Sequence, residues 1–397
     1  MPGVGQSNPS LWTWLPQSNQ SPCDRYRHAC CSYNGDVYLL GGRNSGWLGD
    51  FWKYNVVCNK WTQLSCTGEA APEELEQHSM VAHKLPPFQG FLYVFGGLLD
   101  SASTMSRCAF WVFDVVKQEW VQFQEKANPL QSQMPSNRKG HSAVVIGSAM
   151  LIYGGLVDIK GSSEEFWSLD FGTTNWSQLG PSGSSGPGPR QSHSAVAYQE
   201  AMFLFGGLRG LQEMQDFWKW DSSSDAWTCL RRMSSPPRLL GHSAVVFKDN
   251  MFLFGGGDSH NSTSNFLWSY SFTTQSWSQM LSLGDSNPPT KIHHCCVGLG
   301  QSYSSGTGST TTSEVKPRQM GRRLRCFKNK CFPQPHTHGA DLEMMDMHLT
   351  SGRARKDLLD QEDEGDFRKH LPDSLLVLGG KPFTGNRPIS IWQMTLS

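Results

Sequence analysis

The chain has 397 residues, and its 34 Lys+Arg balance its 34 Asp+Glu, so the formal net charge is zero. This balance argues against binding to nucleic acid or to an anionic membrane by charge alone, and the lack of an apolar run of about 18 residues excludes a predicted transmembrane helix. The 11 cysteines show no Cys-x-x-Cys pair and follow no secretory signal, so we expect reduced thiols and a cytoplasmic, possible nuclear, location.

Short β-like segments recur in six units, each of which divides into segments a to d in chain order. Segment a follows a histidine, segment b ends in a Gly-Gly pair, segment c carries a tryptophan, and segment d carries a second tryptophan nine residues later. The glycine pairs stand at 41–42, 96–97, 154–155, 206–207, 255–256 and 379–380. The histidines are His28, His78, His141, His193, His242 and His294.

The sixth unit has segments a, b and c but reaches Ser397 before a segment d. Leu11–Leu15 at the other end of the chain aligns with the segment d that contains Trp61, so Trp12 supplies the missing tryptophan. We expect this N-terminal strand to complete the last unit, because a half-finished sheet would leave an exposed edge.

Six glycine pairs with tryptophans at fixed offsets resemble the kelch-repeat β-propeller family. The resemblance implies an all-β, six-bladed propeller over 11–397, closed by the N-terminal strand. The predicted blade units are about 25–64, 75–123, 138–179, 190–230, 238–280, and 291–397 closed by 11–15. Propellers of this family mostly bind other proteins and include few enzymes.

The sequence contains no Gly-x-Ser-x-Gly, P-loop, His-Glu-x-x-His or dinucleotide-binding motif, so we expect no enzyme activity, cofactor or metal. The leading interpretation is a scaffold or adaptor that binds proteins. The alternative is a substrate-recognition subunit of a cullin-type ubiquitin ligase, with cullin or elongin components as partners. No BTB domain, F-box or elongin-binding helix pattern supports that alternative in this sequence.

Strand alternation predicts the binding face, because the b–c and d–a loops lie on one face and are longer than those on the other. A cation precedes the repeat histidine in five units: Arg25, Arg138, Arg190, Arg238 and Lys291. After the glycine pairs come Arg43, Asn44 and Arg209. The resemblance implies that these eight candidate residues, with Trp47 as a ninth, ring one channel mouth and bind an acidic or C-terminal carboxylate motif. Alternatively, each arginine bonds a carboxylate or carbonyl in a neighbouring loop.

Residues that occur once in every unit serve the unit, so we expect the repeat histidines to be structural and the tryptophans to form the core. Trp14, Trp47 and Trp220 fall outside the repeat. Trp47 is the best candidate for a surface anchor, since it accompanies Arg43 in a b–c loop, although it could equally pack on the adjacent blade.

An insertion separates segments a and b of the last unit, at about 301–373. Its Ser/Thr/Gly-rich start, basic stretch 316–330 and acidic stretch 360–366 predict a largely disordered segment. The basic stretch could be a nuclear signal or a solvated charge run. Cys326, Cys331, His336 and His338 could hold zinc, but their spacing is unusual.

Overall fold

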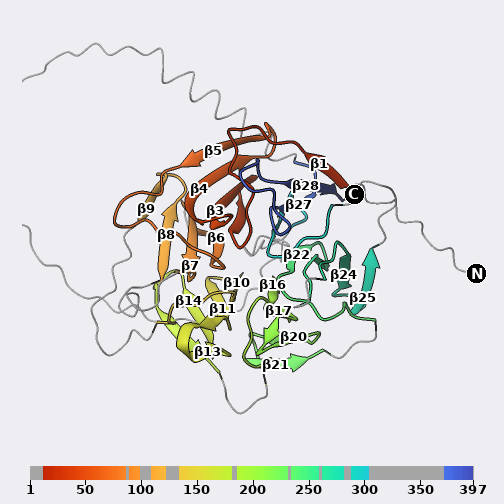
Figure 1. Cartoon of the computed structure of the whole chain (residues 1–397). Helices are drawn as coiled ribbons and strands as arrows, with labels where there is room; N and C mark the ends of the chain where they lie inside the picture. Colours follow the sequence, from red (N-terminus) through yellow and green to blue (C-terminus); the bar gives the residue numbers. More distant parts are fainter. Residues whose placement is uncertain are drawn as a thin grey trace, which may run out of the picture. The chain divides into compact units, whose positions relative to one another are not determined.

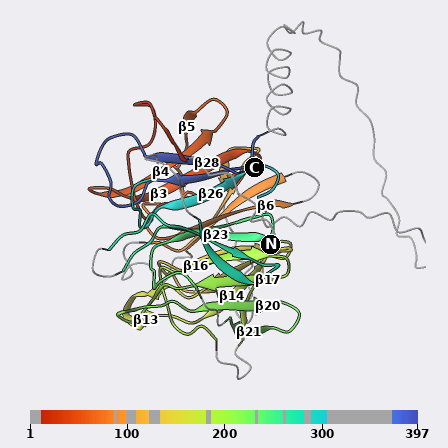
Figure 2. The same cartoon turned by 90° about the vertical axis from the view of Figure 1, so that its right-hand side faces the viewer.

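The computed structural model describes residues 12–85, 89–98, 109–121, 134–180, 186–230, 234–258, 262–280, 288–303 and 371–396. Within these ranges the chain forms six four-stranded antiparallel sheets, which follow one another around a central axis (Figure 1). Turned by 90°, the ring shows β5 (Lys60–Leu64) of blade 1 at one end and β21 (Ala226–Cys229) of blade 4 at the other (Figure 2). The six-bladed propeller predicted from the repeat is therefore confirmed.

Each blade runs outwards from the axis in the order a, b, c, d. Blade 1 has β2 (Ala29–Tyr33), β3 (Asp36–Arg43), β4 (Trp47–Asn55) and β5 (Lys60–Leu64); blade 2 has β6 (Ser79–Leu85), β7 (Gln89–Phe95), β8 (Phe110–Asp114) and β9 (Glu119–Val121). Blade 3 has β10 (Ser142–Ile146), β11 (Ala149–Tyr153), β14 (Phe166–Asp170) and β15 (Trp176–Leu179); blade 4 has β16 (Ser194–Tyr198), β17 (Ala201–Phe205), β20 (Phe217–Asp221) and β21 (Ala226–Cys229). Blade 5 has β22 (Ser243–Phe247), β23 (Asn250–Phe254), β24 (Leu267–Ser271) and β25 (Ser276–Met280); blade 6 has β26 (Cys295–Leu299), β27 (Ser374–Leu378), β28 (Ile391–Thr395) and β1 (Trp12–Leu15).

The second strand of each blade is apolar on both faces, because neighbouring blades cover both sides of the sheet. Every residue of β17 and of β27 is buried. The outermost strands are mostly exposed, and in β1, β5, β15 and β25 the repeat tryptophan is the buried residue. The core therefore consists of apolar layers between blades, with aromatic rings contributing much of the buried area.

The N-terminal strand closes the ring as predicted. β1 pairs with β28, so that Trp12 faces Met394 and Leu15 faces Ile391. The Trp12 ring packs 5.4 Å from the ring of Phe254 in blade 5. One end of the chain thus supplies a strand to the sheet that the other end builds, and the sixth blade has no missing strand.

Trp12 and Trp14 lie on the same strand but face opposite ways, which allows a matched test of this closure. Trp12 is 4% exposed and Trp14 is 56% exposed. We expect Trp12→Ala to lower the free energy of unfolding by about 3 kcal/mol, since a buried indole is replaced by a cavity. Trp14→Ala should change it by no more than about 0.5 kcal/mol. Chemical denaturation of both variants measures the difference, and equal effects would contradict the closure.

Each glycine pair brings its blade against the next one around the ring. The N–H of the second glycine donates to a carbonyl oxygen of the following blade at 2.8–2.9 Å, as from Gly207 to Leu239 and from Gly380 to Arg25. Gly206 has a φ of 63°, and a Cβ there would lie 2.8 Å from the Leu239 oxygen. A side chain is therefore excluded at this junction.

A second set of backbone hydrogen bonds circles the axis. The six residues that precede the repeat histidines all have a positive φ, between 54° and 65°. Each donates its N–H to the carbonyl of its neighbour, at 2.7–2.9 Å, and the set closes on itself. The cycle runs Arg27 to His293, His293 to Gly241, Gly241 to Ser192, Ser192 to Gly140, Gly140 to Gln77 and Gln77 to Arg27. We call these six residues the axial ring.

The predicted insertion at 301–373 falls mainly outside the described residues, which include only its first three and last three positions. The basic stretch 316–330 and the Cys326, Cys331, His336 and His338 set also lie outside them. No helix in the described ranges has the length and apolar character that crossing a membrane requires.

Candidate partner-binding face

The b–c and d–a loops meet on the face that carries the glycine pairs and the axial ring. In five of the six blades the residue after the pair forms a backbone bridge to the residue two before the repeat histidine, as between Arg43 and Tyr26 and between Lys381 and Ile292; in blade 2, Leu98 bridges Leu75, which lies three before His78. Two b–c loops are small hairpins, β12 (Leu156–Val157) with β13 (Gly161–Ser162) and β18 (Leu208–Arg209) with β19 (Gln212–Glu213). A short 3-10 turn, Asp158–Lys160, connects the first pair.

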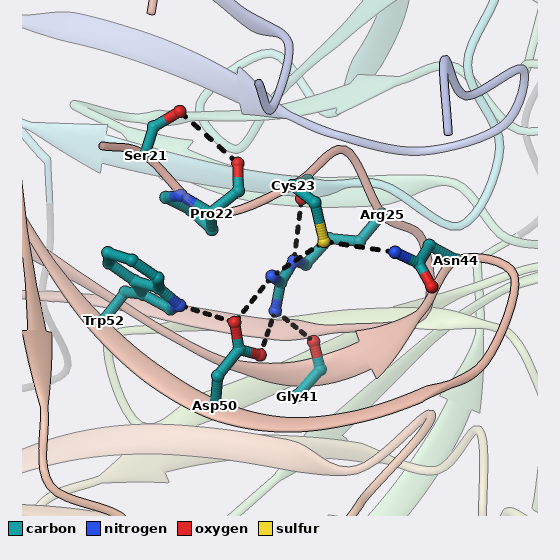
Figure 3. A network of polar contacts seen from close by, with 8 residues as sticks. All are labelled: Ser21, Pro22, Cys23, Arg25, Gly41, Asn44, Asp50 and Trp52. Atoms are coloured by element: carbon teal, nitrogen blue, oxygen red, sulfur yellow. Dashed lines mark hydrogen bonds and ion pairs between the residues drawn. The ribbon is translucent and has the colours of Figure 1, made fainter. Parts of the chain in front are cut away.

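The Arg25 side chain lies inside this face and does not reach its surface (Figure 3). Its guanidinium donates to both carboxylate oxygens of Asp50, at 2.6 and 2.8 Å, and to the Gly41 carbonyl at 3.0 Å. The indole N–H of Trp52 donates to the same carboxylate at 2.6 Å. One carboxylate therefore joins the start of segment a to segment c of the blade.

The same three-part network recurs in blades 3 and 4. Arg138 donates to Glu165 at 2.6 Å and to the Gly154 carbonyl at 3.1 Å, while Trp167 donates to Glu165 at 2.9 Å. In blade 4 the corresponding residues are Arg190, Asp216, Gly206 and Trp218. All three arginine side chains are 0% exposed.

Lys291 takes the arginine position in blade 6. Its ammonium group donates to the carbonyls of Gly380 and Pro382 and to the hydroxyl of Ser390. Burial lowers the pKa of this lysine.

The prediction that the side chains of Arg25, Arg138, Arg190 and Lys291 bind a partner is therefore wrong. Their side chains are hydrogen-bonded to carboxylates, carbonyls and a hydroxyl of their own blade, so none can contact a partner. The alternative bonding to a neighbouring carboxylate or carbonyl describes them correctly. Burial alone would raise the pKa of Asp50, Glu165 and Asp216, but the hydrogen bonds and positive charge of the arginine, together with the indole hydrogen bond, outweigh it and lower the pKa of each carboxyl.

Comparison of the six units shows a signal that identifies these arginines as structural. Where the position three before the histidine is arginine, the residue before segment c is Asp50, Glu165 or Asp216. In blade 2 the two positions are Leu75 and Ala109, and in blade 5 they are Leu239 and Phe266. Arginine and carboxylate thus occur together or are both replaced, as expected for a pair whose members need each other when buried, and blade 6 instead combines Lys291 with Ser390.

Arg238 was predicted as an equivalent of the other cations, but it lies one residue out of register. The buried Leu239 holds the equivalent position, which leaves Arg238 exposed. Arg209 is also exposed, in β18, and its guanidinium lies over Gly188. These two arginines remain available on this face.

Arg43, Asn44 and Trp47 form a second accessible group, in the b–c loop of blade 1. The Arg43 guanidinium lies 5.4 Å from the centre of the Trp47 ring, and Trp47 is 50% exposed. The Asn44 side-chain oxygen accepts the N–H of Gly46 at 3.0 Å, which shapes the loop. Trp220, in contrast, is buried and donates to Asp225, so it belongs to the core.

Three further cations near the axis were missed by the sequence analysis. Arg27 and Lys139 both pair with Glu76, at 3.4 and 3.3 Å, and the Lys381 ammonium lies 4.3 Å from the centre of the Tyr26 ring. They stand one or two residues before a repeat histidine or directly after a glycine pair. The axial ring brings these positions together, and they could have been found by comparing those offsets across units.

The repeat histidines and the axial ring line a hollow of about 120 Å³ on this face. The histidines bond between blades: His141 Nε2 to Ser79 Oγ at 2.8 Å, His193 Nε2 to Ser142 Oγ at 2.9 Å, and His242 Nε2 to the Phe205 carbonyl at 3.1 Å. For these three histidines the predicted structural role is confirmed. Toward the other face, a cavity of about 520 Å³ follows the axis between the innermost strands, with walls of small apolar side chains and cysteines.

Comparisons with known proteins agree with this architecture. Residues 82–306 match the family described as the KLHDC2/KLHL20/DRC7 Kelch-repeats domain, and residues 24–67 match the Kelch motif. Kelch domain-containing protein 10 of Xenopus tropicalis is 28% identical over 53% of this chain and 49% of its own length. Host cell factor 2 of Homo sapiens is 26% identical over 55% of this chain and 29% of its own length. Kelch domain-containing protein 3 of Bos taurus is 28% identical over 54% of this chain and 58% of its own length. The matched region thus spans about half, or less, of the first relatives' length.

Proposed function

Because this chain belongs to the kelch-repeat family, we propose that it is a non-enzymatic scaffold or adaptor that binds another protein on the face of the b–c and d–a loops. The observation that carries this proposal is the Arg43–Trp47 pair. A half-exposed indole beside a guanidinium, on a loop that a rigid blade holds, combines the two residue types that contribute most often to binding hot spots.

The charges of this face favour an acidic segment as the ligand. Arg43, Arg209 and Arg238 have accessible side chains. The buried arginines of this face cannot contact the ligand. A guanidinium pairs with a carboxylate through two parallel hydrogen bonds. The residues proposed to bind the partner are therefore Arg43, Asn44, Trp47, Arg209 and Arg238.

Trp47→Ala combined with Arg43→Glu tests the proposal. We expect proximity labelling with mass spectrometry to show partners that are lost from this variant, and synthetic peptides from their acidic segments to bind the wild-type chain at least tenfold more tightly. Trp14→Ala is the matched control, because Trp14 is similarly exposed but lies on the outermost strand of blade 6.

Partners that survive the double change in a folded variant would contradict the proposed face. Loss of the same partners from the Trp14→Ala control would show that exposed aromatic area, and not this loop, is responsible. Cullin or elongin components among the partners lost would favour the alternative function as a ligase subunit.

A further inference from the structure

The junction between blades 6 and 1 differs chemically from the other junctions. At two of those, the repeat histidine bonds the hydroxyl of a serine that directly follows the previous repeat histidine, as His141 bonds Ser79 and His193 bonds Ser142. At the junction of blades 6 and 1 that serine position holds Cys295, which faces His28. The sequence therefore replaces a hydroxyl with a thiol at the closure of the ring.

A second thiol completes a cluster at this junction. Ligand atoms of His28, Cys30 and Cys295 all lie within 4.8 Å of one another. Cys30 lies on β2 of blade 1 and Cys295 on β26 of blade 6, so the cluster spans the two blades that close the ring. The set combines one imidazole nitrogen with two sulfurs.

His28 is the member of the cluster with unused ligand atoms. It is 5% exposed, and within the described residues neither ring nitrogen meets a donor or acceptor at hydrogen-bonding distance and angle. Leaving a buried imidazole without a partner is costly. His78 and His294 also lack one, but the positions facing them, Ala29 and Ser243, offer no thiol.

We propose that His28, Cys30 and Cys295 form a buried site for a thiophilic closed-shell metal ion, Zn²⁺ or Cu⁺. Zinc–sulfur and zinc–nitrogen bonds of about 2.3 and 2.0–2.1 Å place the ligand atoms of a tetrahedral site about 3.5–3.8 Å apart, so the cluster needs only a small contraction. Thiolates and imidazole are ligands that both ions accept.

The number of ligands distinguishes the two ions. Cu⁺ is satisfied by three ligands, whereas Zn²⁺ takes four. A water molecule can supply the fourth zinc ligand, because Cys30 lines the cavity of about 520 Å³ that follows the axis. Either ion would link β2 of blade 1 to β26 of blade 6. Metal binding would then strengthen the same junction that β1 closes from the outside.

The test uses the full chain, purified with reductant and without oxygen, in a Cys326→Ser/Cys331→Ser background that removes both thiols of the other candidate zinc set. Zn²⁺ or Cu⁺ is added against a chelator of known affinity, and bound metal is counted after desalting. We expect one equivalent of one of the two ions and a rise in melting temperature. Cys295→Ser should abolish both effects and still fold, since it restores the histidine–serine pair that two other junctions have.

Cys296→Ser is the matched control, because Cys296 is the next residue on the same strand and packs in an apolar cluster. It should keep the metal. The proposal would be overturned by equal metal content in the Cys295→Ser and wild-type chains. It would also be overturned if the wild-type chain retained neither Zn²⁺ nor Cu⁺. A Cys30–Cys295 disulfide that persists in protein purified with reductant would overturn it as well.

Discussion

Unfolding of this propeller is expected to require several kcal/mol less free energy at pH 5.5 than at pH 7.5. The reason is the set of buried repeat histidines. Burial lowers the pKa of His78 and His141 from 6.5 to about 3 and that of His242 to about 4, and it holds the pKa of His193 and His294 well below 6.5. Nearby cations, such as Arg138 beside His141, add to the effect.

The direction follows from proton binding. Between pH 6.5 and 4 an unfolded chain protonates these histidines and the folded chain does not, so stability falls as pH falls. Each of these five histidines is expected to lower the free energy of unfolding by about 1.4 kcal/mol between pH 7.5 and pH 5.5. Their summed effect is comparable to the roughly 5–15 kcal/mol by which a typical domain is stable. The carboxyls with lowered pKa values add a further loss only near pH 4 and below.

Denaturant unfolding at a series of pH values measures this dependence. The slope of the unfolding free energy against pH gives the number of protons taken up, and His141→Gln should lower that number by one. A free energy that stays constant between pH 7.5 and 5.5 would mean that the histidines are already protonated in the fold.

Asp216→Ala is expected to destabilise the propeller by about 3–5 kcal/mol, because it leaves the guanidinium of Arg190 buried without its counter-charge. That guanidinium is 0% exposed and donates to Asp216 at 2.8 Å. The substitution also removes the acceptor of the Trp218 indole N–H. Chemical denaturation at pH 7.5 measures the loss.

The double variant Asp216→Ala/Arg190→Leu tests the reason for that loss. It reproduces the pair that blade 2 has at the same positions, Leu75 with Ala109. Since replacing a buried ion pair by apolar residues is often nearly neutral, we expect most of the lost stability to return. A double variant as unstable as Asp216→Ala would show that the loss arises elsewhere, for example from the indole.

The fold could be predicted because its signal is repeated six times with nearly constant spacing. Trp12 illustrates the strength of this signal: its alignment with Trp61 correctly assigned an N-terminal segment to a blade built by the other end of the chain. Local β propensity alone would not have made that assignment, since pairing between distant segments depends on the closure of the whole ring.

The site was predicted less well, because a basic residue near a loop can be either a ligand-binding group or half of a buried ion pair. Arg25, Arg138 and Arg190 recur at a single offset, and by the reasoning applied to the histidines they serve the blade. Arg27 and Lys139 escaped notice because the axial ring, with its left-handed residues, is what gathers them around the axis. That arrangement depends on six loops at once.

The repeated hydrogen bond between consecutive blades also indicates where new chain termini could be placed in a circular permutant. Every junction uses the same donor and acceptor, a glycine N–H of one blade and a carbonyl of the next, so no blade is first or last within the ring. Trp12 pairs with Met394, which places the start of β1 beside the end of β28. A circular permutant that joins these two strands by a tight turn and opens between β15 and β16 would keep every described strand pair, and each of its blades would come from one continuous stretch of chain.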